Sequence, residues 1–136
     1  MKSILSGIIA FILGITSVFS GGQFFKVSLA VVNEVTEQSE TINLEITNKT
    51  LLTASWGDYF TLEKKNGEEW EQVEIIGSFL DYAAVLSPFH TQKQTIDIKK
   101  MFGDYLSKGE YRISKEIDIG NILNNRETVS TEFTVK

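Results

Sequence analysis

Few residues in this sequence have the chemistry that a catalytic or metal site needs. His90 is the only histidine among 136 residues, and there is no cysteine. Thiol catalysis, thiolate zinc sites and disulfides are therefore excluded. A Ser–His–acid triad also needs an activated serine, and no Gly-x-Ser-x-Gly elbow is present. Because His90 directly follows Pro88 and Phe89, we interpret it as a loop residue, and the sequence predicts a protein that is not an enzyme.

The acidic residues are numerous, but their spacing does not suit a metal or a catalytic pair. Glu68, Glu69, Glu71 and Glu74 surround Trp70. Calcium sites use closely spaced Asp and Asn, and no Asp-x-Asp occurs, so we interpret the cluster as a solvated face. Nothing selects two carboxylates for glycoside hydrolysis, and glycine-rich phosphate loops are absent. The sequence predicts no metal and no cofactor, and a hydrolase of wall polymers has no supporting motif.

Aromatic side chains are the best candidates for contact with a partner, because Trp and Tyr are frequent anchors of interfaces. Trp70 follows the pattern of a strand, and we expect it in the core. Trp56 lies in the segment TASWGDY, which we interpret as a loop, and we expect its side chain to be partly exposed. The candidate binding residues are Trp56, Tyr59, Phe79, Tyr82 and Phe89.

The first 20 residues have the layout of an export signal. Lys2 supplies a positive n-region, residues 4–19 carry no charge, and small or branched residues fit the cleavage positions that end at Ser20. Sixteen uncharged residues are short for the roughly 20 predominantly apolar residues that a spanning helix needs. We therefore expect a signal-peptide helix at 1–20 and one exported domain at 21–136. An uncleaved membrane anchor is the alternative.

The net charge of the chain narrows the classes of molecule that could be its binding partner. With 13 basic and 18 acidic residues the formal net charge is −5, which disfavours nucleic acid or anionic lipid as the main partner. We expect a secreted monomer, or one on the outer face of a bacterial envelope. Membrane contact is expected only if the N-terminal segment stays uncleaved.

After position 20 the residues alternate between apolar and polar types, as in antiparallel strands with one buried face. Asn66-Gly67 predicts a type I′ hairpin turn, Ser87-Pro88 breaks the chain, and 99–107 has room for one helical turn. The pattern predicts an all-β, immunoglobulin-like antiparallel sandwich of about seven strands. The expected strands centre on 25–31, 42–46, 60–62, 73–75, 96–98, 111–119 and 129–135.

Two residues of one predicted strand carry further expectations. Tyr111 follows Gly109 by two positions, which is typical of the tyrosine corner of Greek-key sandwiches, where the phenol bonds to upstream backbone. Lys115 falls on the apolar face of this strand. Because a buried unpaired charge is costly, we expect a bulge or a packed stem whose ammonium reaches water.

The central and C-terminal parts resemble a bacterial immunoglobulin-like domain family found in secreted proteins and lipoproteins of Gram-positive bacteria. Residues 56–70, WGDYFTLEKKNGEEW, are similar to its central hairpin, and residues 106–115, LSKGEYRISK, resemble its GxYRIxK segment. The resemblance covers residues 27–135 and implies a sandwich fold and an envelope location, but no activity. Two departures are a Ser87–His90 turn without the family's glycine and the absence of a lipobox cysteine.

Two functions of different classes fit these features. The first is an exported, noncatalytic binding or structural module whose partner is a protein or a wall polymer. The second is a secreted protease inhibitor that presents the loop 77–91, because some small all-β proteinase inhibitors are similar to this domain.

Overall fold

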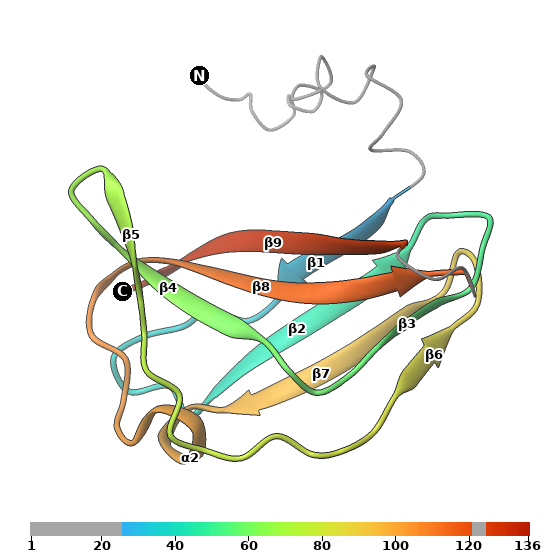
Figure 1. The fold of residues 1–136 in the computed structure, drawn as a ribbon. Coiled ribbons are helices and arrows are strands. Elements are labelled where there is room, and N and C mark those ends of the chain that lie inside the picture. The colour runs from blue at the N-terminus through green and yellow to red at the C-terminus, as the bar shows by residue number, and fades with distance from the viewer. Residues whose placement is uncertain (1–25, 121–124) are drawn as a thin grey trace.

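The computed structural model describes residues 26–120 and 125–136. The predicted signal peptide at 1–20 lies outside these residues. The described chain forms two antiparallel sheets packed as a sandwich, which confirms the predicted fold class (Figure 1). The elements are β1 (Val27–Val31), β2 (Thr41–Asn48), β3 (Ala54–Trp56), β4 (Thr61–Asn66), β5 (Glu69–Gln72), β6 (Ala84–Leu86), β7 (Thr91–Asp97), α2 (Ile98–Phe102), β8 (Gly109–Ile119) and β9 (Arg126–Val135).

The smaller sheet has the strand order β1-β2-β7, and the larger sheet is built around the long strand β8. One side of β8 pairs with β9 over its whole length. The other side pairs first with β4 and then, near its C-terminal end, with β3. Strand β5 extends the sheet from β4, and β6 extends it from β3. The described residues therefore hold nine strands, and the short β3 and β6 are absent from the sequence prediction. The strand expected at 73–75 is wrong in its bounds, because β5 ends at Gln72 and residues 73–75 follow it outside any strand.

The core lies between the two sheets, where the inward residues of each strand meet. Ile42, Leu44 and Ile46 of β2 and Ile113 and Ile117 of β8 are all fully buried. Burial of each such side chain contributes up to about 1.5–3 kcal/mol, so this alternation is the main source of stability. The predicted buried parity of both strands is confirmed.

The predicted β4–β5 hairpin is present, but its turn differs from the expected type. Asn66 still pairs with Glu69, so Gly67 and Glu68 are the two central residues. Of these only Gly67 has a positive φ, +68°, which is the pattern of a type II′ turn. Glycine adopts that conformation without the steric cost that Glu68 would carry.

The helical turn predicted in 99–107 is the short helix α2. Asp97 caps its N-terminus, with a carboxylate oxygen accepting from the backbone N–H of Lys100 at 3.1 Å. Gly103 ends it with φ +89°, and its N–H donates to Lys99 O at 2.8 Å. Ile98 was expected in a strand but begins this helix, because the Asp97 cap ends β7 one residue earlier.

Contacts outside the β8–β9 pairing fix the start of β8 and the end of β9. The Tyr111 hydroxyl donates to Ser107 O at 2.7 Å, which confirms the tyrosine corner. At the end of β9, Val35 forms a parallel bridge with Val135, and the N–H of Lys136 donates to Val35 O at 3.0 Å. No helix within the described ranges is long and apolar enough to cross a membrane.

Candidate functional site

Lys115 organises the connection between β3 and β4. Its side chain is only 1% exposed, and Nζ donates to Gly57 O at 2.9 Å and Tyr59 O at 3.0 Å. The expected bulge or water-exposed ammonium is therefore wrong, since β8 keeps its register through Lys115, opposite Val129. Burial lowers the pKa of Lys115 to about 8, while the Asp58 carboxylate opposes this shift. The loop backbone supplies the polar partners that the charge requires.

Asp58 ties this connection to the segment 77–83. One carboxylate oxygen accepts from the N–H of Leu80 at 2.7 Å. The other accepts from the Gln94 side chain at 3.2 Å and from the Tyr82 hydroxyl at 3.3 Å. Burial first, and then the negative charge of Asp58, raise the pKa of Tyr82 above its usual value. Tyr82 therefore stays a neutral hydrogen-bond donor at physiological pH.

Three of the predicted binding residues gather around these contacts. The ring of Tyr59 meets Phe79 edge-on at 5.0 Å between centroids, and Phe79 in turn packs on the core residue Phe60 at 5.3 Å. Tyr59, Leu80 and Tyr82 remain between 41% and 66% exposed. We call Tyr59, Phe79, Leu80 and Tyr82 the aromatic surface. Sequence reasoning missed Leu80 because it selected candidates by aromatic type alone.

The remaining predicted binding residues lie elsewhere. Trp56 is buried in β3 opposite Ala84, so the expected partial exposure is wrong. Its segment is a strand, and a three-residue strand gives too little alternation to be recognised. Phe89 is exposed, but it lies in the turn between β6 and β7.

Trp70 was expected in the core, and this expectation is also wrong. It lies half-buried on β5, outside the core cluster, in the hairpin that projects beyond the sandwich (Figure 1). The guanidinium of Arg112 lies 4.5 Å from its ring centroid and covers it as a cation–π partner. Arg112 also pairs with Glu63 at 2.8 Å, so this tryptophan belongs to a structural surface cluster.

The hollow beside the aromatic surface is small. It measures about 130 Å³ and lies between Asp58, Leu80 and Gln94. This is below the roughly 300 Å³ typical of small-molecule pockets. Within the described ranges, no three His, Asp or Glu side chains lie close enough together to hold a metal ion.

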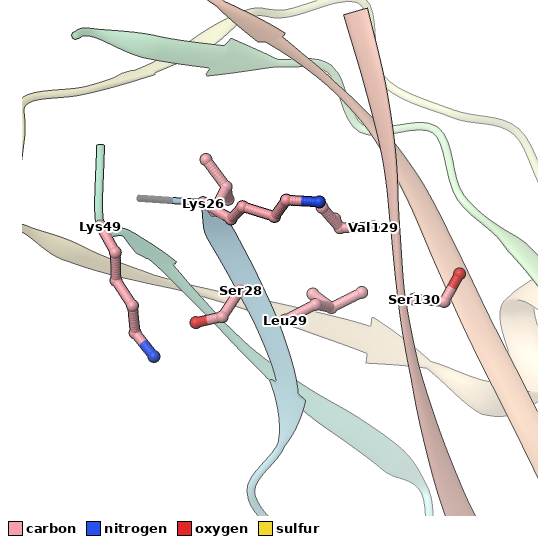
Figure 2. Close-up of a pocket in the computed structure, with 7 residues that line it drawn as sticks. Lys26, Ser28, Leu29, Lys49, Val129 and Ser130 are labelled. Carbon is pink, nitrogen blue, oxygen red and sulfur yellow. The ribbon is translucent and has the colours of Figure 1, made fainter. Parts of the chain in front are cut away.

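A second hollow, of about 290 Å³, separates β1 from β9, the open edges of the two sheets. Figure 2 shows Lys26, Ser28 and Leu29 on the side of β1 and Val129 and Ser130 on β9. Cα atoms of the two strands approach within 8 Å. An added strand needs a gap of about 9.5 Å, twice the usual strand spacing, so this hollow does not admit one.

The segment 77–91 is not one free loop. Residues up to Tyr82 are held against the sandwich through Asp58, residues 84–86 form β6, and a tight turn leads into β7. Figure 1 shows the segment following the side of the sandwich. It presents separate short stretches to solvent.

An antiparallel two-sheet sandwich with a tyrosine corner defines the class of immunoglobulin-like domains. The sequence pattern of the bacterial Ig-like domain matches residues 23–134, and the chain belongs to this family. A search of curated proteins finds no match.

Solved structures with related folds are distant. The archaellum periplasmic stator protein FlaG from Sulfolobus acidocaldarius is 18% identical, with 79% of this chain and 99% of that chain covered and a TM-score of 0.45. The ASH/PapD-like domain 7 of human CEP192 is 14% identical, with 85% and 87% covered and a TM-score of 0.45. No argument about function rests on these two likenesses.

Proposed function

We propose that this protein is an exported, noncatalytic Ig-like module of the bacterial cell envelope or the extracellular space. It binds a protein or wall-polymer partner through the aromatic surface. The signal-peptide layout of residues 1–20 and the membership in the bacterial Ig-like family support export. The lack of a triad or carboxylate-pair motif supports a role without catalysis.

The observation that carries the proposal is the rigid support beneath exposed apolar side chains. Asp58 holds Leu80 and Tyr82 through direct hydrogen bonds, and Lys115 holds the backbone of Tyr59. Side chains that are already ordered lose little conformational entropy on binding. Tyrosine with a free face and a fixed position is a frequent energetic anchor of interfaces. The surface is therefore suited to a flat or shallowly concave partner.

A binding comparison tests this role. The double variant Tyr59→Ala, Leu80→Ser removes exposed side chains and leaves the Asp58 and Lys115 contacts, which use backbone atoms at these two positions. The control Val85→Ser, Tyr105→Ala removes equally exposed apolar side chains from β6 and from the loop after α2. The full-length proteins are immobilised and exposed to purified wall polymer and to envelope proteins of the source cells.

We expect a saturable ligand that binds the unsubstituted protein and the control equally and loses at least tenfold in affinity for the double variant. A loss of this size corresponds to about 1.4 kcal/mol, which is usual for interface anchors. Equal binding by all three proteins would refute the aromatic surface as the binding site.

The secreted protease inhibitor is the second candidate, and the observation that favours it is the exposed Leu80 within the segment 77–91. An inhibitor must hold a side chain at the protease's specificity pocket in a fixed backbone, and the N–H of Leu80 is fixed by Asp58. Titration of subtilisin-type proteases distinguishes the candidates. Inhibition at concentrations below micromolar that is lost in Leu80→Ser would support the inhibitor function. Full protease activity in the presence of the unsubstituted protein would exclude this function.

A further inference from the structure

The end of the sandwich at which β1 begins carries exposed apolar side chains on two loops. Leu51 and Leu52, between β2 and β3, are 70% and 46% exposed, and Phe89, between β6 and β7, is 64% exposed. The loops meet the start of β1, because Val27 pairs with Asn48. Figure 1 shows both connections at this end, opposite α2. This group is separate from the aromatic surface.

A buried amide holds the two loops in place. The Asn48 side chain is fully buried and donates to Leu52 O at 2.8 Å and to Leu86 O at 3.0 Å. Its oxygen accepts from the N–H of Thr50 at 2.9 Å and from the hydroxyl of Thr50 at 2.7 Å. The N–H of Phe89 donates to Asn48 O at 2.6 Å. The apolar side chains are therefore displayed by a fully satisfied network.

Phe89 occupies a backbone position that normally takes glycine. Pro88 and Phe89 are the central residues of a turn closed by the N–H of His90, which donates to Ser87 O at 3.3 Å. Phe89 has φ +62°, so this is a type II turn whose third residue is in the left-handed region. A bulky aromatic side chain is unfavourable there, and such strain is typical of functional positions. The turn thus holds an exposed aromatic ring at an unfavourable backbone position.

The two loops and the start of β1 carry no acidic residue, whereas β8 and β9 bring Asp118, Arg126 and Glu127 to the same end of the sandwich. The segments 26–33, 47–56 and 83–92 contain no Asp or Glu, although the chain has 18 acidic residues. They contribute Lys26 and Lys49, which adjoin because the N–H of Lys49 donates to Lys26 O at 3.0 Å. Apolar side chains bordered by lysines are typical of surfaces that contact anionic bilayers. Lys26 and Lys49 lie beside the exposed leucines with no acidic residue in the same segments, which favours this part of the surface as the point of contact.

The sequence before β1 contains a segment that can enter a lipid bilayer. The uncharged stretch 4–19 is separated from Lys26 by six residues, which span at most about 20 Å when extended. A stretch of this kind lies in the bilayer during export, and also afterwards if it is retained. Where the stretch is retained, the end of the domain next to Lys26 is kept close to the lipid.

From these observations we infer that this end of the domain docks on an anionic lipid bilayer. The docking residues, which we call the apolar tip, are Leu51, Leu52, Phe89, Lys26 and Lys49. The two leucines and Phe89 enter the boundary between headgroups and acyl chains, and the two lysines contact lipid phosphates. The inference rests on the proposed export of the chain, and the tether to the bilayer rests on retention of residues 1–20. It assigns lipid to one end of the domain and leaves the aromatic surface free for the partner.

Tryptophan fluorescence tests the position of the tip. The full-length chain is reconstituted into vesicles of phosphatidylcholine and phosphatidylglycerol, with and without brominated acyl chains, which quench nearby tryptophan. Phe89→Trp places the probe at the tip. Ile76→Trp is the matched control, because Ile76 is 61% exposed and its N–H donates to Met101 O in α2, at the opposite end. The emission of the two native tryptophans is subtracted by means of the unsubstituted protein.

We expect the Phe89→Trp probe to show blue-shifted emission and strong quenching by brominated lipid, and the Ile76→Trp probe to show neither. Adding Lys26→Glu and Lys49→Glu to the tip probe should weaken the quenching, as should vesicles of phosphatidylcholine alone. Equal quenching of the two probes would overturn the inference. So would a tip probe that responds only when envelope proteins are added, since that would make the occupant a protein.

Two controls separate the possible causes of failure. Circular dichroism and thermal unfolding of each variant show that the domain is folded. Flotation of both probe variants with the vesicles reports whether the full-length chain associates with the membrane at all. Flotation without quenching at Phe89→Trp would refute the tip and leave the proposed export intact, whereas loss of flotation in every variant would refute the tip and also count against membrane insertion of residues 4–19, on which the proposed export rests.

Discussion

The buried ammonium of Lys115 makes a contribution to the free energy of unfolding that rises with pH in the alkaline range. The pKa of Lys115 is about 8 in the folded protein and has its usual value of 10.5 in the unfolded chain. Below pH 8 both states bind the proton, and the folded state carries a constant penalty. Between pH 8 and 10.5 the unfolded state binds more protons than the folded state, so the free energy of unfolding increases with pH. Above pH 10.5 the penalty is gone.

The size of the effect follows from the two pKa values. Each pKa unit corresponds to 1.36 kcal/mol, so the interval between about 8 and 10.5 amounts to about 3 kcal/mol. The neutral amine keeps two N–H groups, and these suffice for the two carbonyls of Gly57 and Tyr59. Deprotonation therefore removes the buried charge and leaves the two hydrogen bonds in place.

Urea unfolding of the unsubstituted protein and of Lys115→Met between pH 7 and 11 measures this effect. The variant lacks the titrating group, while the other lysines and tyrosines of the chain titrate in both proteins and cancel in the difference. We expect the unsubstituted protein to gain about 3 kcal/mol over the variant between pH 8 and 10.5. Parallel stability curves would refute the reasoning, since they would mean that Lys115 keeps its ordinary pKa inside the fold.

Three further substitutions probe other contacts, each followed by urea unfolding at pH 7. Tyr111→Phe removes the bond to Ser107 O and should cost about 1 kcal/mol, and an unchanged midpoint would mean that the tyrosine corner adds no stability. Asn48→Asp replaces two buried donors by a carboxylate that faces two carbonyls, and should cost at least about 3 kcal/mol. Phe89→Gly should stabilise the protein by about 1 kcal/mol by relieving the positive φ, and a loss of stability would contradict the strain described for this turn.

The fold class could be predicted from the sequence because the long strands repeat their pattern several times. Strand β2 alternates over eight residues and β8 over eleven, so their buried faces were correctly assigned. The strands β3 and β6 have three residues each, which is too short for a period to be seen. Trp70 has the parity of a strand, but parity does not tell which face meets the core, and its hairpin projects beyond the sandwich.

The candidate site was predictable only in part, because its contacts join residues that are distant in the chain. Sequence reasoning placed Lys115 on the apolar face, which is confirmed, but it could not find carbonyl partners that lie 56 and 58 positions earlier. The same holds for Asp58, whose partners Leu80 and Gln94 come from other parts of the chain. Such pairs are set by the packing of the two sheets, which local patterns do not encode.

The parallel bridge between Val35 and Val135 has a mechanical consequence. The start of β1 and the C-terminus lie at opposite ends of the sandwich, and β1 and β9 run in the same direction between them (Figure 1). A force that pulls these two ends apart slides the bridge lengthwise, so the bonds of Lys136 to Val35 and of Glu37 to Lys136 are loaded together. Resistance to such a force depends on the rate of unfolding rather than on the equilibrium stability. If the domain is held at β1 and a pulling force acts on β9, we therefore expect it to resist until these bonds break together and then to unfold in one step.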